Sequence, residues 1–274
     1  MAIRALVVGG TSGIGYAIAR RVASTSSSAA VTICGRTLPS DLPDNIEFQQ
    51  LEATSMRQIK IFTDAFKSRS QDRRLDLLVM SQGVMTFEGR LETSEGIERK
   101  MALDYYGRKL LVREMTPILK EDARVIFVLN GKEGIPGHIN WNDLEVKHNY
   151  SVWGAAKQAA VMLDISVQHY ALLQQAQGTG GVLTGLSRDW PWYMKLGIRV
   201  LGPLIAVTPD TCAKYLLIGV DKVTAEGDKA GRFWSNIDDK GRLVEHKNIW
   251  TKQQMETLED HTWKLIDAAL NTMD

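Results

Sequence analysis

Residues 5–19, with the sequence ALVVGGTSGIGYAIA, decide the fold of this chain. An apolar run leads into a loop with four glycines, and an apolar helical pattern begins at Ile14. Glycine permits a tight turn and a close approach of the backbone to a ligand, and the first N–H groups of the helix then face a phosphate. The stretch predicts a strand, a phosphate-binding loop and a helix, with a plain glycine turn as the alternative. The residues expected to contact phosphate are Gly9, Thr11, Ser12, Gly13, Ile14 and Gly15.

Short β-branched runs alternate with longer helical patterns along the first half of the chain. This alternation predicts an α/β fold in three layers, with a doubly wound parallel sheet of the Rossmann type. We treat the 274 residues as one domain, with a nucleotide-binding half over 1–150. The expected helices begin near Gly13, Ser55 and Ile97, and the expected strands are Ala5–Gly9, Val31–Cys34, Ile46–Gln50, Leu75–Met80 and Arg124–Leu129.

The second half, 151–274, shows a weaker pattern. A long alanine-rich helix is expected from Ser151 to about Leu173. The segment Gln174–Gly181 is polar and glycine-rich where a buried strand is expected, so the sixth strand is predicted to be altered or missing. The remaining expected elements are a helix opening at Thr208-Pro209-Asp210, a last strand at Arg232–Trp234 and a C-terminal helix over Gln253–Leu270.

Composition narrows the classes of function. The net charge is +1, and the densest basic run is interrupted by Asp72, which disfavours nucleic acid as a partner. The two cysteines, Cys34 and Cys212, stand far apart in apolar surroundings, which favours buried thiols over a disulfide or a metal site. The start of the chain does not resemble a signal peptide, and no apolar stretch has the length of a membrane span. We expect a cytoplasmic protein that acts on a small molecule.

The end of the second expected strand bears on the choice of cofactor. NAD sites usually place an acidic residue there for the ribose hydroxyls, whereas an arginine accommodates the additional phosphate of NADP. Gly35 occupies the acidic position and Arg36 follows it, while Ser12 and Thr37 offer hydroxyl donors. These residues favour NADP(H) over NAD(H). The alternative for Arg36 is a surface charge after a strand.

These residues and the spacing of those downstream resemble the short-chain dehydrogenase/reductase family. The glycine pattern of the family is Thr-Gly-x-x-x-Gly-x-Gly, and only its threonine, replaced by Val8, differs here. The resemblance identifies Glu52 and Ala53 as residues beside the adenine. It places Ser81, Gln82 and Gly83 where the family has its Asn-Asn-Ala-Gly stretch, also against the cofactor. A weaker likeness of the tail points to the retinol-dehydrogenase-like and fungal secondary-metabolism branches.

The resemblance implies a tyrosine as general acid and a lysine one helical turn later that lowers its pKa. Tyr150, which precedes the alanine-rich helix, matches the tyrosine. Four residues later stands Gly154, and Lys157 lies seven residues from Tyr150, so Lys157 is a candidate substitute with a solvated helix lysine as the alternative. Trp153 stands four residues before Lys157, so a shifted register restores the lysine but loses the tyrosine.

The other positions of the family's site are altered or uncertain. Asn130 stands where the family carries its serine, and Asp104 stands in place of the asparagine that supports a proton relay. Thr184 is the candidate for binding the cofactor carboxamide. The segment Trp190–Met194 resembles the variable lid over the substrate, and its aromatic residues suggest an apolar, bulky ligand, with a surface or dimer patch as the alternative.

The sequence therefore predicts an NADP(H)-dependent oxidoreductase that reduces a carbonyl or imine of a hydrophobic small molecule. Two other functions stay open because several catalytic positions differ. One is a redox-neutral isomerase or cyclase that retains the NADP(H) site, and the other is a catalytically inactive NADP(H)-binding protein. Family members are usually dimers or tetramers, which makes a homo-oligomer an expectation from the resemblance.

Overall fold

The computed structural model describes residues 3–69, 74–84, 88–129, 135–177, 182–186, 208–230, 234–238, 240–244 and 250–272. The described strands form one sheet in the order β3-β2-β1-β4-β5-β6-β7-β8, parallel throughout except for the antiparallel pair β7–β8. The strands are β1 (Arg4–Val8), β2 (Ala30–Gly35), β3 (Ile46–Gln50), β4 (Leu75–Met80), β5 (Leu119–Val128), β6 (Val182–Leu186), β7 (Trp234–Ile237) and β8 (Leu243–Val244).

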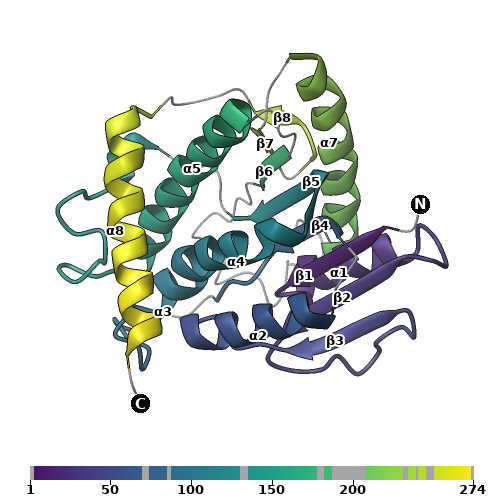
Figure 1. Cartoon of the computed structure of the whole chain (residues 1–274), viewed down its shortest axis with the longest axis horizontal. Helices are drawn as coiled ribbons and strands as arrows, with labels where there is room; N and C mark the ends of the chain where they lie inside the picture. Colours follow the sequence, from purple (N-terminus) through teal and green to yellow (C-terminus); the bar gives the residue numbers. More distant parts are fainter. Residues whose placement is uncertain are drawn as a thin grey trace, which may run out of the picture.

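Helices cover both faces of this sheet (Figure 1). One face carries α1 (Gly13–Ala23) and α7 (Pro209–Ala230), which pack against each other. The opposite face carries α2 (Met56–Arg69), α4 (Gly107–Met115), α5 (Val152–Gln177) and α8 (Lys252–Asn271). The short helix α3 (Arg99–Met101) runs through a π-helical turn, η1 (Ala102–Tyr106), into α4, and two short turns are η2 (Thr116–Ile118) and η4 (Pro136–His138). The predicted three-layer Rossmann fold is confirmed.

The central strand β1, formed by the apolar run before the glycines, is buried on both faces of the sheet. Its residues Ala5, Leu6, Val7 and Val8 are each at most 1% exposed. Leu6 and Val8 pack into the core beneath α2, α4 and α5, whereas Ala5 and Val7 pack into the core beneath α1 and α7. A strand covered on both faces needs apolar residues at every position rather than at alternate ones.

A strand occupies the sixth place in the sheet. Val182–Leu186 forms β6 and pairs in parallel with β5. The polar residues Gln174–Gln177 belong to the end of α5, and the part of Gln174–Gly181 after position 177 lies outside the described residues. The strand expected at Arg232–Trp234 begins at Trp234, and positions 232 and 233 also lie outside the described residues.

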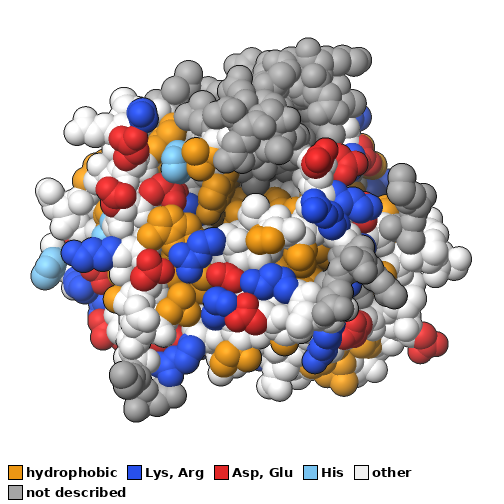
Figure 2. Space-filling view, in the orientation of Figure 1, with side chains coloured by type: hydrophobic (Ala, Val, Ile, Leu, Met, Phe, Trp, Pro, Cys, Tyr) orange, Lys and Arg blue, Asp and Glu red, His pale blue; other side chains and the backbone are white. Residues whose placement is uncertain are grey.

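The order of the strands reverses direction between β1 and β4. At such a switch point the connections leave toward opposite faces, and a crevice opens at the carboxyl ends of the strands. The glycine loop follows β1 at this edge, and the segment from Ser81 follows β4. On the face shown in Figure 2, basic side chains lie beside acidic ones, so neither sign of charge dominates that face. Among the described helices, none has the length and apolar character required to cross a bilayer.

Candidate active site

The glycine loop packs closely against the segment that follows β4. Gly9 has φ of 76°, and its N–H donates to the carbonyl of Cys34 at 2.9 Å. A Cβ at Gly9 would lie 2.6 Å from the Cα of Gln82, and one at Gly15 would overlap the Oγ of Ser81. Ser81 in turn donates to the carbonyl of Gly9 at 3.0 Å. Glycine is therefore required at both positions, because a side chain would push the two crossing segments apart.

The start of α1 faces a cavity of about 660 Å³. Ser12 is the N-cap residue, but its side chain makes no capping hydrogen bond, and the first turn carries no acidic residue. A Cβ at Gly13 would meet no atom within 4 Å. Unfilled N–H groups beside open space form a site for an anion such as a phosphate. Of the predicted phosphate contacts, Gly9, Thr11, Ser12, Gly13, Ile14 and Gly15 all line the cavity.

The end of β2 contributes to the same part of the cavity. Arg36 is exposed and lines the cavity beside Gly35. A Cβ at Gly35 would lie 2.7 Å from the Oγ1 of Thr11, so the loop crosses directly over this glycine. Thr37 is exposed and is not among the described residues that line the cavity.

The turns after β3 and β4 supply the other predicted cofactor contacts. Glu52, Ala53, Ser81, Gln82 and Gly83 all line the cavity. Glu52 accepts hydrogen bonds from the N–H and Oγ1 of Thr54, at 3.1 and 2.8 Å. Gln82 is 5% exposed, and its amide nitrogen and oxygen have no hydrogen-bond partner among the described residues. A buried amide without partners is costly, and a polar ligand would satisfy it.

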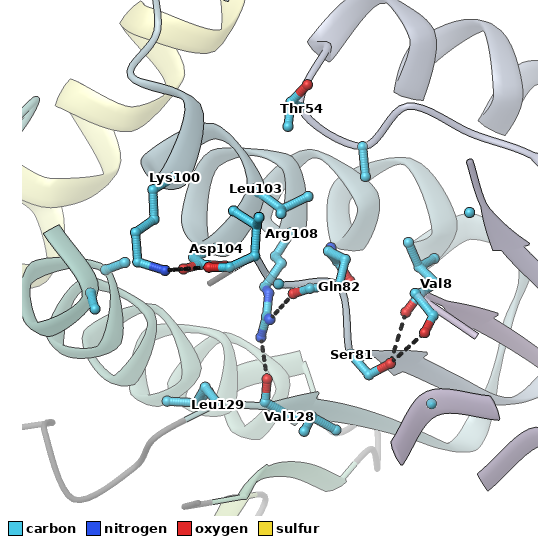
Figure 3. A pocket seen from close by; sticks show the side chains of 18 of the residues that line it. Val8, Thr54, Ser81, Gln82, Lys100, Leu103, Asp104, Arg108, Val128 and Leu129 are labelled. Carbon is cyan, nitrogen blue, oxygen red and sulfur yellow. Dashed lines mark hydrogen bonds and ion pairs between the residues drawn. The ribbon is translucent and has the colours of Figure 1, made fainter. Parts of the chain in front are cut away.

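Arg108 on α4 joins the ends of two neighbouring strands. Its guanidinium donates to the carbonyl of Gln82 at 2.5 Å and to the carbonyl of Val128 at 3.0 Å (Figure 3). Burial lowers the pKa of Arg108 to about 10, although the nearby charge of Asp104 favours its cationic form. The sequence analysis missed this residue. The spacing of Lys100, Asp104 and Arg108 at four-residue intervals was the available signal, because such residues share one face of a helix.

Asp104 forms a partly buried ion pair with Lys100, one turn earlier. The Nζ of Lys100 donates to Oδ2 of Asp104 at 2.7 Å and to the carbonyl of Val84 at 3.1 Å. Both side chains line the cavity, and Figure 3 places them on the opposite side from Val8 and Ser81. Lys100 was also missed by the sequence analysis.

Tyr150 is half-buried and points its hydroxyl toward a carboxylate. It donates to Oε1 of Glu98 at 3.2 Å, while Oε2 of Glu98 caps α3 by accepting the N–H of Met101 at 2.7 Å. Burial, together with the charge and hydrogen bond of Glu98, raises the pKa of Tyr150 to about 12. Tyr150 is not among the described residues that line the cavity.

The cavity-facing side of α5 presents Trp153 and Lys157, four residues apart. This geometry fits the shifted register, in which Lys157 takes the place of the family's lysine and Trp153 that of its tyrosine. An indole N–H donates hydrogen bonds but does not ionise near neutral pH, so it cannot act as a general acid. The catalytic roles of Tyr150 and Lys157 stay predictions.

Several predicted site residues lie wholly or partly outside the described residues. Asn130 and the neighbouring Gly131 lie outside them, and so does the predicted lid Trp190–Met194. The backbone of Thr184 lies in β6, opposite Ile126 of β5.

Comparison with known proteins identifies the family of the chain. Residues 4–171 match the sequence model of the short-chain dehydrogenases, which is more than half of the chain. The chain belongs to the short-chain dehydrogenase family. The predicted resemblance is thereby confirmed, and membership supports an oxidoreductase that uses a nicotinamide cofactor.

Curated relatives include oxidoreductases from fungi and mammals. An oxidoreductase of Emericella nidulans is 34% identical over 195 residues, which cover 67% of this chain and 58% of the relative. The polyprenol dehydrogenase of Homo sapiens is 29% identical over 277 residues, which cover 90% of this chain and 83% of the relative. The match therefore spans little more than half of the fungal protein.

Solved structures share the fold at low sequence identity. A short-chain dehydrogenase/reductase from Burkholderia multivorans with bound NADP superposes with a TM-score of 0.60 at 18% identity, covering 90% of this chain and all of that one. A protein from Mycobacterium paratuberculosis gives a TM-score of 0.67 at 16% identity, covering 97% and 93% of the two chains.

Proposed function

We propose that this chain is an NADP(H)-dependent oxidoreductase that reduces a carbonyl or imine of a hydrophobic small molecule. One observation carries the proposal: a single cavity joins the open helix start and Arg36 to the partly buried pair Lys100–Asp104. A dinucleotide has phosphates at some distance from its reactive ring, which is the arrangement that such a cavity accommodates. Family membership and the NADP-bound structural neighbour support the same cofactor.

The residues present fit this cofactor. The N–H groups at the start of α1 would hold the pyrophosphate, and Arg36 would pair with the additional phosphate of NADP. The unpartnered amide of Gln82 would bind a sugar hydroxyl. When bound, NADPH would supply the hydride, and Arg108 holds together the carboxyl ends of β4 and β5 through the carbonyls of Gln82 and Val128.

Support for an apolar substrate comes from the lining and from one relative. Val84, Leu103, Leu129 and Trp153 contribute apolar surface to the cavity. The human relative that covers most of this chain is named a polyprenol dehydrogenase. We infer that a long apolar aldehyde, such as that of an isoprenoid, is a better substrate than a sugar or an amino acid.

The proposal is tested by following NADPH oxidation with farnesal, acetophenone and dihydroisoquinoline as probes, with products identified by mass spectrometry. We expect one alcohol or amine formed for each NADPH consumed, with farnesal preferred. Conversion of a probe without loss of NADPH would favour the redox-neutral isomerase or cyclase. NADPH binding without conversion of any probe contradicts the reductase.

A further inference from the structure

The side chains that line the cavity include few groups able to release a proton. Hydride transfer to a carbonyl carbon leaves negative charge on the oxygen, which must then gain a proton. Among the residues that the structure describes, the titratable ones lining the cavity are Arg36, Glu52, Arg99, Lys100, Asp104, Arg108 and Lys157. Arginine is in general a poor proton donor, and Arg108, whose pKa burial lowers, already uses its guanidinium to hold the carbonyls of Gln82 and Val128. Glu52 bonds to its own turn, and Asp104 accepts the hydrogen bond of Lys100. Two lysines remain.

Neither aromatic residue near the start of α5 fills this role in the structure. The hydroxyl of Tyr150 donates a hydrogen bond to Glu98, and Tyr150 is not among the described residues that line the cavity. Its raised pKa means that the hydroxyl holds its proton more tightly than a free phenol does. Trp153 does line the cavity, but its indole does not titrate.

Of the two lysines, Lys100 is the more deeply buried and the more firmly positioned. It is 8% exposed, whereas Lys157 is partly exposed. Its ammonium carries three N–H donors, and the described residues account for two of them, through Asp104 and the carbonyl of Val84. The third is available for a ligand in the cavity that Lys100 lines.

We propose that Lys100 is the proton donor of this site, acting where family members use a tyrosine. The inference rests on the proposed function. The carbonyl carbon gains a C–H bond from the hydride of NADPH, the carbonyl oxygen gains an O–H bond, and an N–H bond of the Lys100 ammonium breaks. The substrate is reduced and NADPH is oxidised to NADP⁺. The neutral amine regains its proton from water, and Asp104 stays a carboxylate that positions it.

The charges around Lys100 suit proton release coupled to hydride loss. Lysine and tyrosine have similar reference pKa values, about 10.4 and about 10, so an ammonium is intrinsically no worse a proton donor than a phenol. Asp104 on the same helical face favours the ammonium. The positive ring of NADP⁺, when bound, would disfavour it, and Glu98, which accepts the hydroxyl of Tyr150, adds a further carboxylate at the start of α3. Lys157 lines the same cavity from α5.

A titration that needs no turnover tests the position of Lys100. The NMR signal of the Lys100 Nζ would be followed as a function of pH in protein with isotope-labelled lysines. The signal would be assigned by its absence from the spectrum of Lys100→Arg. We expect the titration midpoint to be lower by about one pH unit in the NADP⁺ complex than in the NADPH complex, because only the oxidised ring is positively charged. Equal midpoints would place Lys100 away from the reacting ring and overturn the inference.

Four variants then separate proton donation from electrostatics. Lys100→Arg retains a cation beside Asp104, but a guanidinium is a much weaker acid than an ammonium, so kcat with farnesal should fall by about a hundredfold or more, as in Lys100→Met. The dissociation constant for NADPH should change by less than about threefold, as in the control Lys60→Arg, a half-buried lysine that pairs with Asp64 and does not line the cavity among the described residues. The reason is that proton transfer and not cofactor binding is lost. Full activity of Lys100→Arg, or loss of activity in Tyr150→Phe alone, would overturn the inference. A wild-type protein that converts no probe contradicts the proposed function instead, and the titration then decides the position of Lys100.

Discussion

At the scale of single residues, the two ends of the cavity carry different groups. Gly35 keeps the crossing of the glycine loop close, and the exposed Arg36 beside it offers a guanidinium to the cavity. Sequence reasoning identified both from local spacing. It did not identify Lys100 or Arg108, because their partners are Val84, Gln82 and Val128 on other segments of the chain.

Arg36→Ala should separate the two nicotinamide cofactors. We expect NADPH to bind about ten- to a hundredfold more weakly and NADH to bind almost unchanged, because a charge-assisted bond to phosphate contributes about 1.5–3 kcal/mol. Fluorescence titration with each cofactor measures the change. Arg20→Ala is the control, because Arg20 is an exposed arginine that pairs with Asp41. An equal loss for both cofactors would refute the assignment of Arg36.

Gly15→Ala should close the anion site. The added Cβ would overlap both the Oγ of Ser81 and the carbonyl of Gly9, so the loop must move. We expect a loss of about 1–3 kcal/mol in the free energy of unfolding and at least a tenfold loss of NADPH affinity. The double variant with Ser81→Ala should not recover binding, because the backbone clash persists. Gly89→Ala, where a Cβ meets no atom within 4 Å, serves as the control.

At the scale of elements, helix starts followed from local sequence better than strand and helix lengths did. The strand expected from Arg124 begins at Leu119, because Leu119 pairs with Leu75 across a register shift although the residues after it are polar. The helix expected to end near Leu173 continues to Gln177. Glutamine is a good helix former, so polarity alone did not mark an end.

The start of α2 depends on a residue far along the chain. Glu95 accepts the N–H groups of Met56 and Arg57 at 2.7 and 3.0 Å, and the hydroxyl of Ser55 at 2.7 Å. One carboxylate thus accepts three hydrogen bonds at this helix end, and its negative charge stabilises the positive end of the helix dipole. No local pattern indicates this cap.

Glu95→Ala should therefore weaken α2. Loss of the cap should lower the free energy of unfolding by about 1–2 kcal/mol, as measured by urea denaturation. Glu256→Ala, on the exposed surface of α8, is the matched control and should change stability by less than about 0.5 kcal/mol. Equal stability of the two variants would show that Glu95 does not hold the helix.

At the scale of the whole molecule, a buried ion pair ties the C-terminal helix to the domain. Lys109 of α4 is fully buried and pairs with Glu259 of α8. The ammonium also lies 4.1 Å from the ring centre of Tyr170, and Glu259 accepts the indole N–H of Trp263 at 2.8 Å. The pair joins residues 150 positions apart, so it forms only when α4, α5 and α8 pack together.

Glu259→Gln should destabilise the fold by about 3 kcal/mol at neutral pH, because it leaves the Lys109 ammonium buried without a counter-charge. Burial tends to raise the pKa of Glu259, but the imidazole of His169, 3.4 Å away, and the charge of Lys109 bring it below its usual value of 4.5. A carboxyl group with a lowered folded-state pKa contributes stability at neutral pH and loses it as pH falls through that pKa. The difference in the free energy of unfolding between wild type and variant, measured by urea denaturation, should thus become smaller at about pH 3. A difference that is independent of pH would contradict this account.

The sequence by itself determined the strand, loop and helix around the glycines, the Rossmann-type sheet and the position of Arg36. These features depend on residues that are neighbours in the chain, where spacing and backbone conformation are read directly. Only the tertiary structure decided that Tyr150 bonds to Glu98, that Trp153 and Lys157 line the cavity, and that the Lys100–Asp104 pair, whose members stand four residues apart in the sequence, faces the same cavity. Such contacts arise from the packing of separate segments, and the free energy of that packing is not visible in any local pattern.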